Sequence, residues 1–221
     1  MSTFVLVHGA GDSGWYWHLV ATELRSRGHD VVAPDLPAGD DSLELADYVD
    51  AVVAAVGDRS GLVVVGQSFG AFTATLVAER LRAELLILIA GMVPAPGERP
   101  DDWWSATGYR QSAMDVGDTY ELYYHDVPRD LADEALRRER DHPSAASGAA
   151  PWPLPHWPDV RTKFVLCTED RLFPPDFLRR VVDERLGITP DEIAAGHCVA
   201  LSRPAELADL FDRYVTDRAD N

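Results

Sequence analysis

Short runs of apolar residues, rich in valine, leucine and isoleucine, recur along the chain and alternate with amphipathic stretches. Runs without polar interruptions are typical of parallel strands that are buried on both faces of a sheet. The pattern predicts five such strands and a sixth, more polar one, which contains Pro190 and is therefore expected at the sheet edge. The six predicted strands span residues 3–8, 30–33, 62–66, 85–90, 162–167 and 189–193.

Segments with helical periodicity lie between these strands. Pro174 and Pro204 stand where a first helical turn accepts proline, and Gly28 and Gly187 stand where helices end. The alternation of strand and helix predicts an α/β fold, with a mostly parallel, doubly wound, six-stranded sheet that binds ligands at the carboxyl ends of its strands. The predicted helices span residues 15–27, 42–56, 69–81, 174–185 and 204–216.

One long stretch, residues 91–159, interrupts this alternation and carries most of the prolines together with many aromatic residues. A stretch of this length outside the repeating pattern predicts a cap inserted into a core formed by residues 1–90 and 160–221. Within it we expect a helix over 131–141 and a loop over 144–155. The alternative is a surface excursion whose aromatic side chains pack only against one another.

Composition narrows the possible partners. The chain has 221 residues, a formal net charge of −17 and a pI near 4.6, so nucleic acid and anionic membranes would be repelled. We therefore expect a small, neutral substrate, and no metal or other cofactor is indicated because no set of ligating residues has convincing spacing. The sequence shows neither a secretory signal nor a membrane span, which predicts a cytoplasmic protein. Cys167 and Cys198 are expected to be free thiols. The sequence leaves the choice between monomer and homodimer open.

The segment Gly66-Gln67-Ser68-Phe69-Gly70 follows a predicted strand and opens a predicted helix. This GxSxG pattern in a strand-turn-helix context is typical of a nucleophile elbow, in which the tight turn exposes the serine hydroxyl above the sheet. The alternative is that Ser68 merely caps a helix. Ser68 is the candidate nucleophile.

A serine nucleophile requires a base, and the base requires an acid to orient it. His197 lies just after the last predicted strand and is the candidate base, with a loop histidine of no special role as the alternative. Asp170 follows the fifth strand and is the preferred acid. Glu169, one residue earlier, is a possible substitute, and both could instead be solvated loop carboxylates.

The tetrahedral intermediate of acyl transfer needs two backbone N–H donors. Phe69, directly after the candidate nucleophile, offers one, and Ala10, in the glycine-bracketed turn after the first strand, offers the second. We expect His8 to brace this turn rather than to take part in chemistry.

The same turn is also a literal GxGxxG, Gly9 to Gly14, and Asp35 ends the next predicted strand. This combination occurs in dinucleotide-binding folds. However, bulky aromatic residues follow Gly14 at the start of a helix that would have to approach a pyrophosphate. The nucleotide hypothesis also leaves the serine, aspartate and histidine in the order of a hydrolase triad unexplained. We therefore interpret Asp35 as a turn residue.

Together these segments resemble the α/β-hydrolase superfamily, and more closely its plant-type branch of methylesterases, methylketone synthases and hydroxynitrile lyases with their bacterial esterase relatives. The resemblance covers nearly all of the chain outside the predicted cap. Departures are Gln67 where a histidine is common, Ala71 where a third glycine is common, and Gly196 where an aspartate often precedes the histidine. The matching segments are Val5-Leu6-Val7-His8-Gly9-Ala10 with Trp15 and Trp17, Pro34-Asp35-Leu36-Pro37, the elbow, Cys167-Thr168-Glu169-Asp170 with Pro174, and Gly196-His197 followed by Pro204.

The resemblance implies a serine hydrolase of the carboxylesterase type, which cleaves a small neutral ester through an acyl-serine intermediate. Two alternatives remain on the same framework. One is carbon-carbon lysis of the hydroxynitrile lyase type, for which the family pattern has a threonine near Gly9 and Ala10 and a lysine where this chain has Cys198. The other is a catalytically silent fold that binds a ligand.

Overall fold

A computed structural model of the chain describes residues 1–109 and 118–217. Its centre is a six-stranded sheet in which all neighbouring strands are parallel, in the order β2-β1-β3-β4-β5-β6. The polar sixth strand lies at one edge, as its composition predicts. The strands are β1 (Thr3–Val7), β2 (Asp30–Val32), β3 (Leu62–Gln67), β4 (Leu85–Ile89), β5 (Thr162–Cys167) and β6 (Asp191–Ile193).

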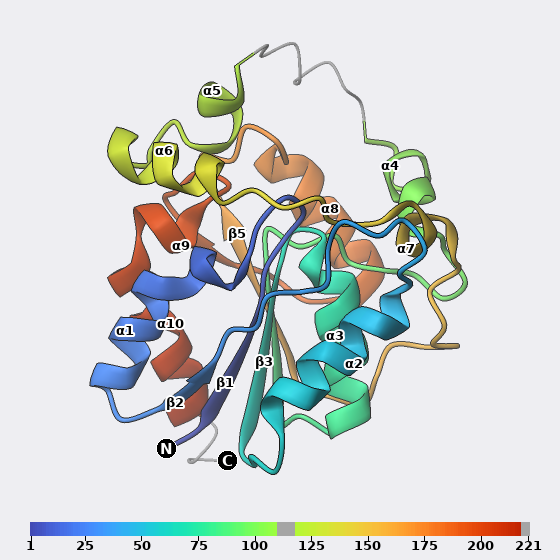
Figure 1. Cartoon of the computed structure of the whole chain (residues 1–221), viewed down its shortest axis with the longest axis horizontal. Coiled ribbons are helices and arrows are strands. Elements are labelled where there is room, and N and C mark those ends of the chain that lie inside the picture. The colour runs from blue at the N-terminus through green and yellow to red at the C-terminus, as the bar shows by residue number, and fades with distance from the viewer. Residues whose placement is uncertain (110–117, 218–221) are drawn as a thin grey trace.

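Helices cover both faces of the sheet, which confirms the predicted α/β fold. On one face α1 (His18–Ser26) packs against α10 (Pro204–Thr216), and on the other α2 (Leu45–Val56) packs against α3 (Gly70–Leu81) (Figure 1). The 3-10 helix η1 (Gly14–Trp17) precedes α1. The helix α8 (Pro175–Leu186) follows β5.

The central strands β1, β3 and β4 are buried along their whole length, because both faces of the sheet are covered. Burial of these apolar runs removes most of their surface from water and provides the main stabilisation of the fold. The rigid sheet in turn fixes the positions of the loops at its carboxyl edge, where the strands end.

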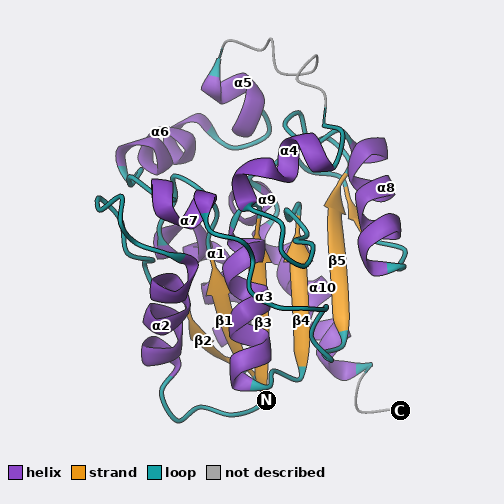
Figure 2. Ribbon diagram, turned by 90° about the vertical axis from the view of Figure 1, so that its right-hand side faces the viewer, coloured by secondary structure: helices purple, strands orange, loops and turns teal. Residues whose placement is uncertain are grey.

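The segment between β4 and β5 lies across this carboxyl edge (Figure 2). The expected helix over 131–141 begins two residues earlier and is shorter than predicted, and the expected loop over 144–155 was wrong in part because it contains a short helix. Sequence analysis also missed the one-turn helix α9 (Val199–Ser202). The elements of the segment are η2 (Pro100–Asp102), α4 (Trp103–Ala106), α5 (Thr119–Tyr123), α6 (Arg129–Arg137) and α7 (Ala145–Ala149).

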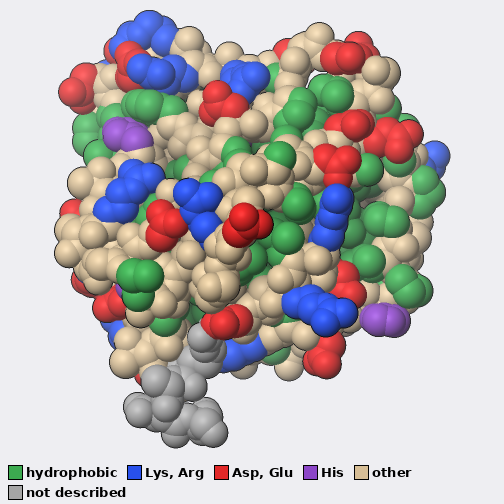
Figure 3. Space-filling view, turned by 60° about the horizontal axis from the view of Figure 1, so that its bottom comes forward, with side chains coloured by type: hydrophobic (Ala, Val, Ile, Leu, Met, Phe, Trp, Pro, Cys, Tyr) green, Lys and Arg blue, Asp and Glu red, His purple; other side chains and the backbone are tan. Residues whose placement is uncertain are grey.

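Viewed from the end where the strands begin, the surface carries acidic and basic side chains interspersed with one another (Figure 3). No helix in the described parts of the chain is long and apolar enough to cross a membrane. Both cysteines, Cys167 and Cys198, are free and buried, as expected from their spacing.

Candidate active site

Ser68 occupies a sharp turn between β3 and α3. Its φ of +51° is uncommon for a residue with a side chain and stores backbone strain. The neighbouring chain holds this conformation, because the Ser68 N–H donates to the carbonyl of Ile89 at 3.1 Å and the Met92 N–H donates to the Ser68 carbonyl at 3.0 Å. The strained turn directs the serine side chain into a cavity at the carboxyl edge of the sheet.

The two glycines of the motif are required by close packing. A Cβ atom on Gly66 would lie 2.5 Å from the Cβ of Ala74, and one on Gly70 would lie 2.4 Å from the carbonyl oxygen of His8. These distances are well below van der Waals contact. The GxSxG pattern therefore allows α3 to start directly against β1 and β3, which fixes the serine between them.

His197 and Asp170 are hydrogen-bonded to each other. The His197 Nδ1 lies 2.8 Å from Asp170 Oδ2, and each residue is only 4% exposed. The other carboxylate oxygen, Oδ1, accepts hydrogen bonds from the N–H groups of Leu172 at 2.8 Å and Phe173 at 3.0 Å. Glu169, the alternative acid, is exposed, and the carboxylate that is hydrogen-bonded to the imidazole is that of Asp170. The carboxylate of Asp170 thus places the imidazole proton on Nδ1 and leaves the lone pair on Nε2.

Gln67 donates a hydrogen bond to this lone pair, which sequence analysis did not foresee. Its Nε2 lies 3.1 Å from His197 Nε2, while its Oε1 is buried without a partner. The side chain is 1% exposed and is pressed against Gly9, where a Cβ would lie 2.3 Å from the Gln67 oxygen. Ser68 borders the same cavity as His197, but the hydrogen bond at Nε2 comes from Gln67 rather than from the serine hydroxyl.

The turn after β1 reaches the same cavity. Ala10 and Phe69 both border it, as Ser68 does. His8 braces the turn, since its Nδ1 donates to the Gly9 carbonyl at 2.9 Å and its Nε2 accepts from the Leu36 N–H at 3.0 Å. Burial lowers the pKa of His8 to about 4, so this imidazole stays neutral at neutral pH.

The segment between β4 and β5 also holds the loops that carry the acid and the base. Asp126 accepts a hydrogen bond from the Gly196 N–H at 2.9 Å, directly before His197 in the chain. His125 donates to the carbonyl of Glu169 at 3.0 Å, directly before Asp170. Two consecutive residues of this segment therefore stabilise both loops, a contact that no local sequence signal indicates.

The cavity has a volume of about 470 Å³ and is bordered by both core loops and the overlying segment. Trp104, Tyr123 and Tyr124 are among its lining residues, so part of the aromatic content of the segment faces the site. Trp103 and Trp152 are instead fully buried within the packing. Trp103 packs against Phe173 and Phe177, with ring centroids 5.6 and 5.8 Å apart, so the aromatic residues of the segment do not pack only against one another.

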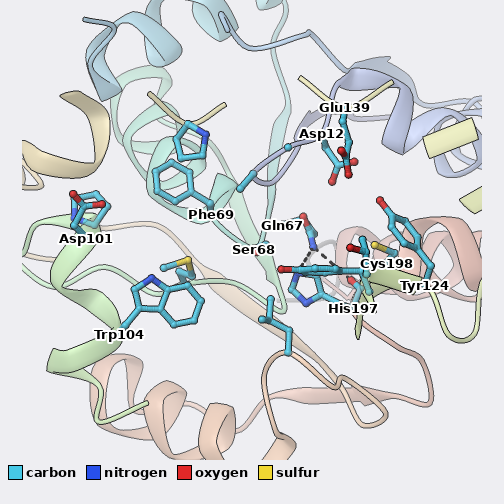
Figure 4. A pocket seen from close by; sticks show the side chains of 18 residues that line it. Asp12, Gln67, Ser68, Phe69, Asp101, Trp104, Tyr124, Glu139, His197 and Cys198 are labelled. Carbon is cyan, nitrogen blue, oxygen red and sulfur yellow. Dashed lines mark hydrogen bonds between the residues drawn. The ribbon is translucent and has the colours of Figure 1, made fainter. Parts of the chain in front are cut away.

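Two acidic side chains border the cavity close to the base. In Figure 4, Asp12 and Glu139 point toward each other on the side of Ser68 where His197, Tyr124 and Cys198 lie, and Trp104 lies on the opposite side. Burial, together with the nearby Glu139 carboxylate, raises the pKa of Asp12 to about 7, although the positive charge that His197 can carry opposes the shift. Sequence analysis considered Asp12 only as part of the GxGxxG pattern and did not single out Glu139.

Asp35, the acidic residue of that pattern, forms structural contacts within the fold. It accepts a hydrogen bond from the Gly14 N–H at 2.8 Å and forms an ion pair with Arg140 at 3.1 Å. A Cβ on Gly14 would lie 2.2 Å from the carbonyl oxygen of Ala33, so this glycine serves close packing. Over residues 1–109 and 118–217 no three histidine, cysteine or acidic side chains are grouped so that they could hold a metal ion.

Comparisons with known proteins agree with this architecture. The chain is 25% identical to norfluorocurarine synthase 1 of a Strychnos species, over 92% of this chain and 91% of that protein. It is 26% identical to esterase PIR7B of Oryza sativa subsp. japonica, over 94% and 93% of the two chains. The structure of a pyrethroid hydrolase from Sphingobium faniae JZ-2 superposes with a TM-score of 0.82 at 19% identity, covering 100% of this chain and 99% of the other. Residues 4–210 match the model of the alpha/beta hydrolase family, and the chain belongs to that family.

Proposed function

We propose that the protein is a serine hydrolase that cleaves carboxylic esters, with Ser68 as nucleophile, His197 as base and Asp170 as the acid that orients it. The hydrogen bond between Asp170 and His197 at 2.8 Å, beside a strained elbow serine in one cavity, carries this proposal. The similarity to an esterase supports it. The silent-fold alternative gives no reason to keep a strained serine backbone beside a buried acid-base pair.

In the proposed reaction the Ser68 oxygen attacks the ester carbonyl while His197 Nε2 takes the hydroxyl proton. The negative charge that forms on the carbonyl oxygen is stabilised by the N–H groups of Ala10 and Phe69. The C–O bond to the alcohol then breaks, and His197 returns the proton to the departing oxygen. Water, activated by the same base, hydrolyses the acyl-serine and releases the carboxylic acid. The hydrogen bond from the Gln67 side-chain amide to His197 Nε2 must break during the first step, so that this nitrogen can accept the serine proton.

The cavity disfavours the hydroxynitrile lyase alternative. Departing cyanide requires a cation nearby, whereas the described lining contains neither lysine nor arginine. Burial raises the pKa of the Cys198 thiol well above its usual range, so this residue supplies a neutral group where the lyase pattern has a lysine. A threonine at Gly9 would have to displace the buried Gln67 amide, because even a Cβ would lie 2.3 Å from its oxygen.

The test is labelling and turnover of the Ser68→Ala protein. Paraoxon should add one diethylphosphoryl group to the wild-type protein and none to the variant, as measured by intact-protein mass spectrometry. Hydrolysis of p-nitrophenyl acetate should fall on the order of 10⁴-fold. Ser60→Ala, an exposed serine outside the cavity, is the matched control and should behave as wild type. Undiminished turnover in folded Ser68→Ala protein would refute the proposed nucleophile.

A further inference from the structure

The charged lining of the cavity is entirely acidic among the described residues. Asp12, Asp101 and Glu139 border it, and no arginine or lysine does. Asp12 and Glu139 form no ion pair with any described cation, whereas Asp126 and Asp35 elsewhere in the fold are held by backbone N–H groups or by arginine. Asp12 is partly buried, so its negative charge is costly there, and the nearby carboxylate of Glu139, which is itself exposed to solvent, adds to that cost. A bound cation would relieve this cost.

The position of the two carboxylates identifies the part of the substrate that they face. Asp12 is close enough to His197 for the imidazole charge to act on it, and both lie beside Tyr124 in Figure 4. In ester cleavage the base must return its proton to the departing alcohol oxygen, so the alcohol portion lies on the side of the base. Asp12 and Glu139 therefore border the space into which the alcohol portion extends.

Aromatic side chains complete this part of the cavity. Tyr123 and Tyr124 both line it, and the Tyr123 ring packs edge-on against His197 with centroids 5.7 Å apart. The faces of aromatic rings attract ammonium groups, and the attraction is stronger where water is excluded. Carboxylates and tyrosine rings around one space form a chemical environment that suits a positively charged nitrogen.

We propose that the substrate is an ester whose alcohol portion carries a positively charged nitrogen, held by Asp12, Glu139 and the neighbouring tyrosine rings. This inference rests on the proposed ester hydrolysis and specifies its substrate class. It also revises the expectation of a neutral substrate, because net charge describes the whole surface whereas the cavity lining determines what binds at the serine.

The kinetic test compares two esters of the same shape that differ only in charge. Acetylcholine carries a permanent ammonium, and 3,3-dimethylbutyl acetate has carbon in place of the nitrogen. We expect kcat/KM for acetylcholine to exceed that for the neutral ester about tenfold or more at pH 8. Steps that both esters share, including proton transfer to His197, cancel in the ratio of the two constants.

The ratio should also change with pH, because Asp12 with its raised pKa of about 7 carries its charge fully only above that pH. We expect the preference for the cation to fall at least about threefold between pH 8 and pH 5.5, since the Asp12 carboxyl group is then largely protonated. Neither ester titrates in this range. The titratable groups that interact electrostatically with Asp12 are Tyr16, Tyr124, Glu139, His197 and Cys198.

Variants separate a local effect from the general field of an acidic protein. The double variant Asp12→Asn, Glu139→Gln should reduce the ratio to near one. The control variant Asp130→Asn, Glu206→Gln removes the same charge from exposed helix positions outside the cavity and should keep the wild-type ratio. Equal ratios in both double variants would overturn the proposal.

A binding measurement keeps this inference separate from the proposed hydrolysis. Calorimetry on the Ser68→Ala protein should show choline binding about tenfold or more tightly than 3,3-dimethylbutan-1-ol, its uncharged counterpart. If choline binds in this way but neither ester is cleaved by wild type, ester hydrolysis fails and the cation site stands. If both esters are cleaved equally well and choline has no advantage, the cation site fails and ester hydrolysis stands.

Discussion

Replacement of Asp12 by asparagine should stabilise the protein, and increasingly so as the pH rises. The pKa of Asp12 is raised from the ordinary value of 3.8 to about 7 in the folded protein. Below pH 3.8 the carboxyl group is protonated in both the folded and the unfolded chain, so it does not lower the free energy of unfolding. As the pH rises toward 7 only the unfolded chain ionises, and stability is lost until the folded pKa is reached. Asparagine carries no charge at any pH and avoids this loss.

The magnitude follows from the difference between the two pKa values. A difference of about three pH units corresponds to about 4 kcal/mol of lost stability above pH 7. Asp12 is partly exposed to the cavity, and solvent there weakens the effect, so we expect about 2 kcal/mol. For a chain of 221 residues this raises the unfolding temperature by about 4 °C.

The assay is thermal unfolding followed by circular dichroism between pH 5.5 and 8.5. The Asp12→Asn protein should unfold about 2 °C above wild type at pH 5.5 and about 4 °C above it at pH 8. Asp130→Asn, an exposed residue of α6, controls for the loss of one negative charge and should give a small difference that does not rise in this way. The reasoning would be refuted if the Asp12→Asn protein unfolded at a lower temperature than wild type at pH 8. It would also be refuted if the difference in unfolding temperature were the same at every pH.

Two further predictions concern the base. Asp170→Asn should lower kcat about 10³-fold or more, because His197 loses the acceptor at Nδ1. Glu169→Gln should change kcat less than about threefold. If ester assays instead show the larger loss for Glu169→Gln, Glu169 is the acid. Gln67→Met removes the donor that competes with Ser68 for His197 Nε2, a bond worth about 1 kcal/mol, and should accelerate inactivation by paraoxon about fivefold. Slower inactivation would show that the amide holds the imidazole in place instead.

The parts of the fold that follow from local patterns could be predicted from the sequence. Each buried strand is a continuous apolar run, and the elbow is a contiguous motif in a recognisable context, so the sheet and the position of Ser68 follow directly. The division into a core and a cap at residues 91 and 159 stays a prediction. The shortest helices were predicted least well, because α7 and α9 are too short for a helical period to appear in their sequences.

The features of the site that sequence analysis missed all depend on residues far apart in the chain. Asp12 follows β1, whereas Glu139 follows α6 in the segment between β4 and β5, and each resembles an ordinary solvated carboxylate until the fold brings them to one cavity. The bond from Gln67 to His197 joins residues 130 positions apart. Its only sequence signal was a departure from the family pattern, which indicates that a position differs but not what the new side chain contacts.

Asp126 and His125 restrict how this protein could be redesigned. A common way to give an enzyme a new specificity is to exchange the segment that covers its reaction centre for that of a relative. Here the same two neighbouring residues tie the loops of His197 and Asp170 in place. A chimaera that replaced the whole segment would lose these bonds together with the old specificity. Recombination should therefore keep this dipeptide, or select donor segments that supply equivalent acceptor and donor groups at the same place.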